Sequence, residues 1–406
     1  MRLRPLLSCA ILLGAMVATL LRTWRPPNDW AEAHWLLDYR FGFVKRGLCG
    51  EVLSWFGEVT EARIAAVVQT FAALFVAALF VMAVRVARAA DWRPATVAAL
   101  AAFLTSPFLV MTGHVVGYFD HVFFLLGAAS IWLALRGRVL PGAPLQAGLV
   151  FVHEASIALT FPAFTLAVML PLLESRANAR AWLATLWPLL LPLATAALFS
   201  QVVGAPPDGW KPQYLAWLRA HEFVDRGMAG TVADQLTWPL SRFREVVGQF
   251  SLPRLWKAES AYLYLLVLPG VAVLLALCWR RARIGVASLQ APAVLFVALV
   301  PQAMHLIAYD LERIFTLSLM TTWFVAWIYH ERAPVGDPVP SRAFSLAVFV
   351  AACALVVGNC LTTIGLMDLE VDQLSFAARA AVAGAVVAAL CGLMVGDLRG
   401  ASTQST

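Results

Sequence analysis

The sequence has little charge. Charged residues make up 13% of its 406 residues and hydrophobic residues 61%, with a mean hydropathy of +0.77. Soluble domains carry roughly twice that charged fraction, so a soluble enzyme or binding domain is excluded. Repeated apolar runs of about 18–25 residues match the thickness of a bilayer core. We therefore predict an all-α, polytopic integral membrane protein that forms a single transmembrane domain over residues 1–406.

Lysine is nearly absent from the chain. Only Lys45, Lys211 and Lys257 occur among the 30 basic residues, so the net charge of +6 is almost entirely arginine. In a membrane protein an excess of arginine reports orientation in the bilayer. We accordingly expect a lipid bilayer as partner and no nucleic acid.

The signatures of soluble catalysis are also missing. The six cysteines show no CxxC spacing, and the chain has no Walker A loop, GxGxxG, HExxH or GxSxG sequence. These absences argue against nucleotide hydrolysis, dinucleotide chemistry, zincin proteolysis and serine hydrolysis by the usual motifs. His114 and His121, with Asp120 between them, form only a weak metal pattern. No cofactor and no metal are indicated.

The apolar runs predict about 12 transmembrane helices. They lie at 5–22, 64–86, 95–112, 121–136, 144–158, 161–174, 182–202, 260–279, 286–308, 314–331, 343–365 and 376–396. The first run follows a basic start and resembles a signal peptide, but no small-x-small cleavage site follows it. We interpret it as a retained anchor.

Residues 145–173 are ambiguous, because they fit either one long helix or a short hairpin. A hairpin turning near 160–162 places every short arginine-rich connection on one side, as the positive-inside rule requires. It also places both termini in the cytoplasm and two long loops, 23–63 and 203–259, outside. Both loops are rich in tryptophan, which predicts interfacial helices on the outer surface. The arginine- and alanine-rich composition indicates a bacterial inner membrane.

A short echo links the two loops. The sequences "FVKRGLCG" (43–50) and "FVDRGMAG" (223–230) share five of eight positions. The echo fits either an old duplication or a local device used twice, in which glycine stops a helix after a basic residue.

Ionisable residues in or beside membrane spans are costly, and they are functional candidates by default. Four sets stand out, and the orientation derived from the arginines places all of them outside. They are His114, Asp120 and His121; His153 and Glu154; His305, Asp310, Glu312 and Arg313; and, in the first loop, Asp29, Glu32, His34, Asp38, Arg40, Lys45 and Arg46. This agreement predicts one outward-facing polar site.

Each set also has a structural interpretation. His153 and Glu154 fit a pair that holds the hairpin together, and Asp310 and Arg313 have the spacing of an ion pair on one helix. Asp120 has the position of a helix cap. The first loop by itself fits a surface helix of mixed charge.

The layout, with "NDWAEAHW", "RFGFVKRG" and "YDLERI", resembles the GT-C membrane glycosyltransferases and related bacterial polysaccharide polymerases. The resemblance implies a polyprenyl-phosphate-linked sugar donor, a glycan or lipid acceptor, and a role in surface glycan assembly. It also implies a catalytic carboxylate in the first external loop, where Asp38, Asp29 and Glu32 match but form no DxD or ExD sequence. The implied substrate- and phosphate-binding residues are Arg40, Lys45, Arg46, His114, Asp120, His153, Glu154, His305, Asp310 and Arg313.

Three alternatives stay open at this point. An O-antigen type polymerase or ligase would use the same phosphate clamps. A transporter or flippase for a lipid-linked solute would need access to both faces of the membrane. In a non-catalytic assembly subunit, the charged sets would form interfaces.

Overall fold

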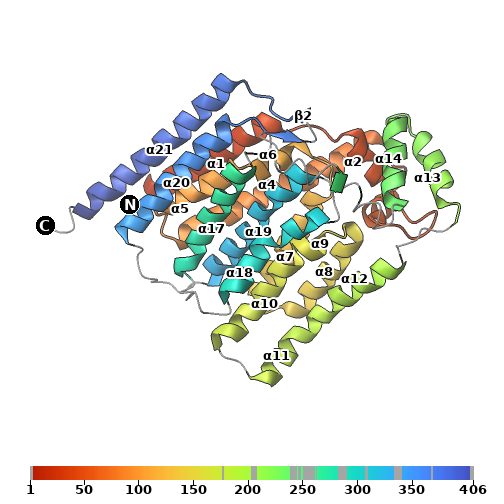
Figure 1. Cartoon of the computed structure of the whole chain (residues 1–406), viewed down its shortest axis with the longest axis horizontal. Coiled ribbons are helices and arrows are strands. Elements are labelled where there is room, and N and C mark those ends of the chain that lie inside the picture. Colours follow the sequence, from red (N-terminus) through yellow and green to blue (C-terminus); the bar gives the residue numbers. More distant parts are fainter. Residues whose placement is uncertain are drawn as a thin grey trace.

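The protein folds as an elongated bundle of helices (Figure 1). The computed structural model describes residues 3–175, 178–202, 208–237, 245, 248–249, 261, 263–281, 290–306, 310–332, 341–366 and 369–402. In these ranges the regular secondary structure consists of helices joined by loops, apart from one hairpin of two-residue strands. The all-helical prediction is therefore confirmed.

The elements follow in chain order. The first half contains α1 (Leu3–Thr23), α2 (Asp29–Trp35), α3 (Gly47–Ser54), α4 (Glu61–Ala89), α5 (Pro94–Leu104), α6 (Pro107–His114), α7 (Asp120–Leu135), α8 (Val139–Val152), α9 (Ser156–Leu159), α10 (Phe161–Ser175), α11 (Ala179–Leu186), η1 (Trp187–Leu189) and α12 (Leu190–Val202). The second half contains α13 (Trp210–Arg219), α14 (Arg226–Thr237), η4 (Leu263–Val267), α17 (Leu268–Arg281), α18 (Gln290–Leu299), η5 (Val300–Leu306), α19 (Leu311–Arg332), α20 (Arg342–Leu361), β1 (Gly365–Leu366), β2 (Leu369–Glu370) and α21 (Phe376–Ser402).

Seven helical segments within the described residues are long and apolar enough to cross a membrane. They are Leu3–Thr23, Glu61–Ala89, Pro94–His114, Ser156–Ser175, Ala179–Phe199, Arg342–Leu361 and Phe376–Leu398. Asp120–Leu135, Val139–Val152 and Tyr264–Cys278 are apolar but shorter. The prediction of about 12 spans is thus not confirmed by helix length and composition, and seven is the number that meets both conditions.

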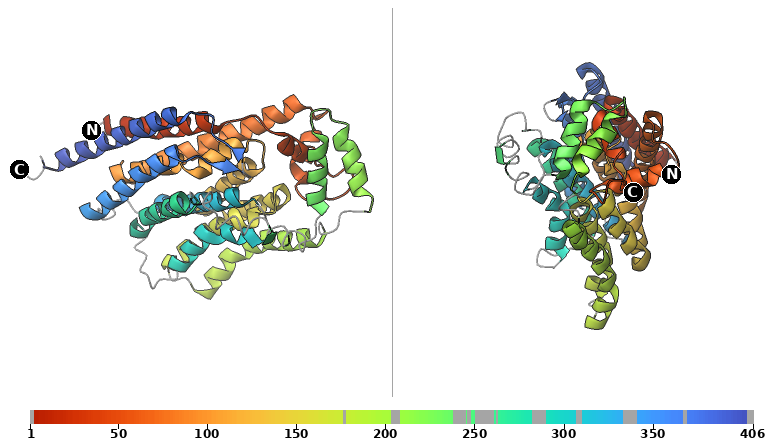
Figure 2. Two further views of the ribbon diagram at one scale, coloured as in Figure 1. Left: turned by 45° about the horizontal axis from the view of Figure 1, so that its top comes forward. Right: turned by 90° about the vertical axis from the view of Figure 1, so that its right-hand side faces the viewer.

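The segment α5–α6 forms the centre of the bundle. All eleven residues of α5 are buried, against α1, α4, α17, α20 and α21. The helix is interrupted at Thr105 and Ser106, because Pro107 provides no backbone N–H and begins α6. Both termini lie at one end of the bundle, while α2, α13 and α14 lie at the other (Figures 1 and 2). We call the latter the loop-one end.

The chain reverses within the ambiguous segment, but not where the sequence predicted. The Thr160 hydroxyl donates to Oε1 of Gln146 (3.0 Å), and Gly142 lies against the ring of Phe164. Both pairs are symmetric about residue 153, so α8 and α9–α10 run antiparallel around a turn at His153. Thr160 only separates α9 from α10. The turn therefore brings His153 and Glu154 to the loop-one end.

The first loop folds into two short helices that pack closely over this end. Asn28 caps α2 by accepting the N–H of Ala31 (3.0 Å). Gly117 (φ +99°) lets the turn before α7 approach the loop, since a Cβ there would lie 2.8 Å from Cβ of Ala31. A Cβ on Gly50 would lie 2.0 Å from the Leu37 carbonyl oxygen, so only glycine permits α3 to pack against the backbone that follows α2.

The second loop contributes α13 and α14, which pack beside the first. The Tyr214 hydroxyl donates to the carbonyl of Ala33 (3.0 Å) and joins α13 to α2. The two copies of the echo both lead into a helix: Arg46 precedes α3, and Arg226 is the first residue of α14. The expectation that glycine stops a helix there was wrong, because the glycines lie in the first turns. Residues 203–207, 238–244, 246–247 and 250–259 of this loop lie outside the described ranges.

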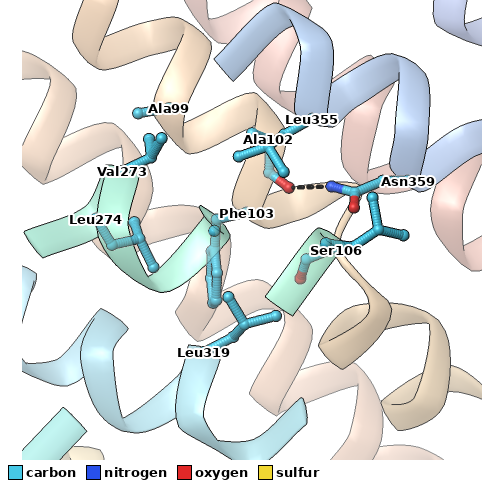
Figure 3. Close-up of a pocket in the computed structure, with 11 residues that line it drawn as sticks. Ala99, Ala102, Phe103, Ser106, Val273, Leu274, Leu319, Leu355 and Asn359 are labelled. Atoms are coloured by element: carbon cyan, nitrogen blue, oxygen red, sulfur yellow. Dashed lines mark hydrogen bonds between the residues drawn. The ribbon is translucent and has the colours of Figure 1, made fainter. Parts of the chain in front are cut away.

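A small cavity lies between α5, α17, α19 and α20 (Figure 3). The amide nitrogen of Asn359 donates to the Ala102 carbonyl beside it (2.9 Å). The cavity measures about 10 Å³, close to the space that one water molecule needs. It is too small for a sugar or a lipid chain, so a substrate site must lie elsewhere.

Candidate functional site

Arg46 forms the first part of a partly buried polar cluster at the loop-one end. Its Nε and Nη2 donate to the two carboxylate oxygens of Glu154 (3.2 and 2.8 Å), and Nη1 lies 3.3 Å from Nε2 of His34. Arg46 has a left-handed backbone (φ 63°), which is uncommon outside glycine. The paired geometry orients the guanidinium, which connects loop one to the turn after α8.

Arg313 forms the second part. Its Nε and Nη2 each donate to an oxygen of Asp120 at 2.7 Å, and its Nη1 donates to Asp310 at 3.2 Å. The guanidinium carbon lies 5.0 Å from the ring centre of Tyr118, within cation–π range. The ion pair of Asp310 and Arg313 is therefore present, but Asp120 is the stronger partner.

His153 lies between the two parts. Its ring is close enough to Arg46, Glu154, Asp120 and Arg313 to interact electrostatically with each of them. Its Nδ1 accepts the N–H of Ala155 (3.1 Å), which fixes the ring at the turn. We call the whole group the loop-one polar cluster: His34, Arg46, Asp120, His153, Glu154, Asp310 and Arg313.

The cluster joins elements that are far apart in the chain. Its members come from α2, the start of α3, the start of α7, the turn after α8 and the start of α19. All four sets predicted from the sequence contribute at least one residue. The predicted convergence beneath loop one is thus found in the structure.

The protonation states follow from burial and from the neighbouring arginine. Burial and Arg46 lower the pKa of His34 to about 3, so this ring is neutral at physiological pH. Burial disfavours an ionised Glu154, but Arg46 outweighs it and holds the pKa of Glu154 well below its usual range. Burial raises the pKa of Asp310, and Arg313 offsets only part of the increase.

The cluster is reachable from solvent. The side chains of Arg46 and Arg313 are 22% and 17% exposed, and that of Glu154 is 37% exposed. Each guanidinium has five N–H donors, and the contacts above leave some of them free in both arginines. An anion could therefore bind to the free N–H groups while Glu154, Asp120 and Asp310 keep their contacts with the two arginines. Lys45, which is near enough to Glu154 to affect its ionisation, adds positive charge at this edge.

The predicted catalytic carboxylates lie elsewhere. Residues 32 and 34 are separated by about 200° around a helix, so Glu32 and His34 face opposite sides of α2. Glu32 lies beside Asp29 and Glu61, and burial together with these two charges raises the pKa of Glu32 to about 7. Asp29 and Glu32 are therefore on the side of α2 that faces away from the arginines.

Asp38 and Arg40 form a separate pair. Nε of Arg40 donates to both oxygens of Asp38 (2.9 and 2.7 Å), and the guanidinium stacks 3.6 Å from the ring centre of Trp217. Both residues line an open hollow on the surface. Arg40 therefore lies apart from the loop-one polar cluster.

Two predicted histidines have local roles. His305 Nε2 lies 3.1 Å from the Gln302 amide oxygen, within η5. His114 ends α6, where the charge of Arg25 is close enough to act on it. Neither contacts a member of the cluster through a hydrogen bond that the described residues show. Within the same residues, no three His, Cys, Asp or Glu side chains are grouped as metal ligands.

A second buried charge cluster was not predicted from the sequence. Asp372 pairs with both Arg22 and Arg379, and Arg22 also donates to the carbonyls of Asn359 and Thr362. This cluster ties the end of α1 to the end of α20 and the start of α21. Arg22 and Arg379 flank apolar runs, so each one alone has the pattern of an ordinary span boundary.

Comparison of the chain with protein families, with curated proteins and with solved structures finds no match. The argument for function therefore depends on the geometry described above.

Proposed function

We propose that this protein is a membrane glycosyltransferase of the GT-C type, which uses a polyprenyl-phosphate-linked sugar donor at the periplasmic face of a bacterial inner membrane. The observation that carries the proposal is the loop-one polar cluster. Two oriented and partly exposed arginines lie there under the interfacial helices of the first loop.

The orientation rests on charge at the two ends of the bundle. The short connections at the end opposite loop one are arginine-rich: Arg85, Arg88 and Arg93 lie where α4 leads into α5, and Arg136 and Arg138 lie between α7 and α8. An arginine-rich end faces the cytoplasm, which directs the loop-one end to the periplasm. The finer topology in this proposal has twelve crossings, counting α7, α8, α17, α18 and α19 as spans shielded by their neighbours.

The chemistry follows from the free donors and the carboxylates. Arg46, Arg313 and Lys45 hold the donor phosphate, since guanidinium groups match phosphate oxygens. The acceptor hydroxyl oxygen attacks the anomeric carbon of the donor sugar, and the bond from that carbon to the phosphate oxygen breaks. The phosphate leaves with the bonding electrons and is stabilised by the arginines. A carboxylate accepts the hydroxyl proton.

Asp310 is the best base among the carboxylates of the cluster. Its Oδ1 accepts no hydrogen bond from the described residues, whereas Glu154 and Asp120 each receive two from an arginine. The raised pKa of Asp310 makes it a stronger proton acceptor than Glu154. This assignment moves the catalytic role away from Asp38, Asp29 and Glu32.

Substitutions at Arg46, Arg313 and Asp310 test the proposal. Arg46→Lys and Arg313→Lys remove the paired geometry, and Asp310→Asn removes the base. Each should lower cell-surface glycan by about 100-fold or more and cause polyprenyl-linked sugar to accumulate, as expected for a lost catalytic group. Both are measured by glycan staining and by mass spectrometry of extracted lipids.

Arg332→Lys is the matched control, because Arg332 lies at the other end of the same helix and pairs with Glu174. It should leave surface glycan unchanged. Normal glycan in folded Arg46, Arg313 and Asp310 variants would refute the transferase proposal.

A further inference from the structure

An open hollow on loop one has chemistry unlike that of the loop-one polar cluster. It measures about 390 Å³, within the range of roughly 300–1,000 Å³ for ligand pockets, and is lined by Asp38, Tyr39, Arg40, Glu51 and Ser54. We call it the acidic hollow. Its residues come from the segment before α3 and from α3 itself.

The charge of the hollow is negative. Two carboxylates, Asp38 and Glu51, face a single guanidinium, that of Arg40. The charge of Arg40 is balanced by Asp38, to which its Nε and Nη2 bind, and its guanidinium stacks on Trp217, so the carboxylate of Glu51 leaves the hollow with a net negative charge. A phosphate or a carboxylated sugar would therefore be repelled from this hollow.

Glu51 keeps hydrogen-bonding capacity. One oxygen accepts the N–H of Tyr39 (3.0 Å) and the other accepts Nε1 of Trp55 (3.0 Å). Because each carboxylate oxygen accepts about two hydrogen bonds, one site on each oxygen is left for a ligand. The same hydrogen bond holds the indole of Trp55, which is 68% exposed, next to Glu51, although Trp55 is not one of the residues that line the hollow.

This combination is typical of carbohydrate recognition. A flat, fixed aromatic ring offers a face for the C–H groups of a sugar, and a carboxylate accepts hydrogen bonds from hydroxyl or ammonium groups. Glu51 follows Arg46 by five residues, about 7.5 Å along a helix axis. The hollow is thus close in the chain to the proposed donor site, but it is separate from it.

We propose that the acidic hollow binds the acceptor glycan through a sugar unit that has no negative charge, with preference for a unit that carries a protonated amine. The role of the bound sugar as acceptor rests on the proposed transferase function. The binding selectivity itself does not depend on turnover.

The test measures binding of three methyl glycosides, those of glucosamine, glucose and glucuronate, to the full-length protein in nanodiscs. Saturation-transfer NMR gives the affinities without any donor present. The amino sugar should bind at least about fivefold more tightly than the anionic sugar, as expected for one charge contact screened by water.

Two variants locate the site. Glu51→Gln keeps an acceptor for Tyr39 and removes the charge, so it should reduce the preference to less than about twofold. Trp55→Ala removes only an exposed ring and should weaken binding of all three sugars by a similar factor. The control is Glu58→Gln, an exposed glutamate of the same loop that does not line the hollow.

The inference is overturned if no glycoside binds saturably, if the anionic sugar binds as well as the amino sugar, or if Glu51→Gln keeps the selectivity. Loss of glycan in the Arg46 variant without sugar binding here would leave the transferase proposal standing and remove only the acidic hollow. Selective binding with normal glycan in the Arg46 variant would do the reverse.

Discussion

Among the residues that the structure describes, Asp372 is the carboxylate that pairs with both buried arginines, Arg22 and Arg379, and its removal is the sharpest test of the packing. Its side chain is fully buried, and those of Arg22 and Arg379 are only 4% and 6% exposed. In Asp372→Asn both guanidinium groups stay buried without a carboxylate. Breaking a buried ion pair in this way costs about 3–5 kcal/mol of unfolding free energy.

Removing an arginine should cost less. In Arg379→Met the pair of Arg22 and Asp372 persists, and Oδ2 of Asp372 still accepts the N–H of Ile364 (3.2 Å). The expected loss is about 1.5–3 kcal/mol, the contribution of a hydrogen bond to a charged group. The assay is denaturant unfolding of the purified protein in detergent micelles.

Asp397→Asn is the control, since its pair with Arg4 is exposed at both side chains and should contribute less than about 1 kcal/mol. The reasoning is refuted if Asp372→Asn is no more destabilising than Arg379→Met. Equal losses would mean that the carbonyls of α20, rather than the carboxylate, neutralise the two arginines.

Two further predictions concern the first loop. Gly50→Ala should sharply lower the yield of monodisperse protein in gel filtration, because the new Cβ would overlap the Leu37 carbonyl. Gly384→Ala is the control, since a Cβ at Gly384 would enter open space and should leave the yield unchanged. Equal yields for the two variants would contradict the close packing of α3. Glu32 has a pKa of about 7 when folded, so the folded state holds a proton that the unfolded chain releases, and stability should fall as pH rises from about 4.5 to about 7. Glu32→Gln should remove that decrease in a pH series of thermal unfolding, and an unchanged profile would exclude Glu32 as its source.

The sequence was sufficient for the fold class and for the end of the bundle where the predicted charged sets gather. Apolar runs of membrane-spanning length specify helices whatever their neighbours, because an unpaired backbone cannot stay in a bilayer. Asn28 and Thr60 cap the helices that follow them, and although such caps depend only on neighbouring residues, we did not predict these two. The gathering of charged sets at one end followed from where the spans begin and end.

The pairing within the site was decided by tertiary structure. Arg46 and Glu154 are 108 residues apart, and Arg313 and Asp120 are 193 apart. The sequence indicated the local partner, Asp310, since helical spacing is all that it reports. It could not show that Glu32 and His34 would face different surroundings on the two sides of α2.

Two other features depended on packing alone. The chain turns at His153, although Pro162 was the clearer break in the sequence, because a proline is tolerated in the first turn of α10. In the cluster of Arg22, Asp372 and Arg379, the two arginines are 357 positions apart in the chain. Composition and spacing therefore determine which residues can lie at the loop-one end. Only the contacts between helices decide which charges neutralise each other, because this pairing depends on distances in space that no local sequence pattern encodes.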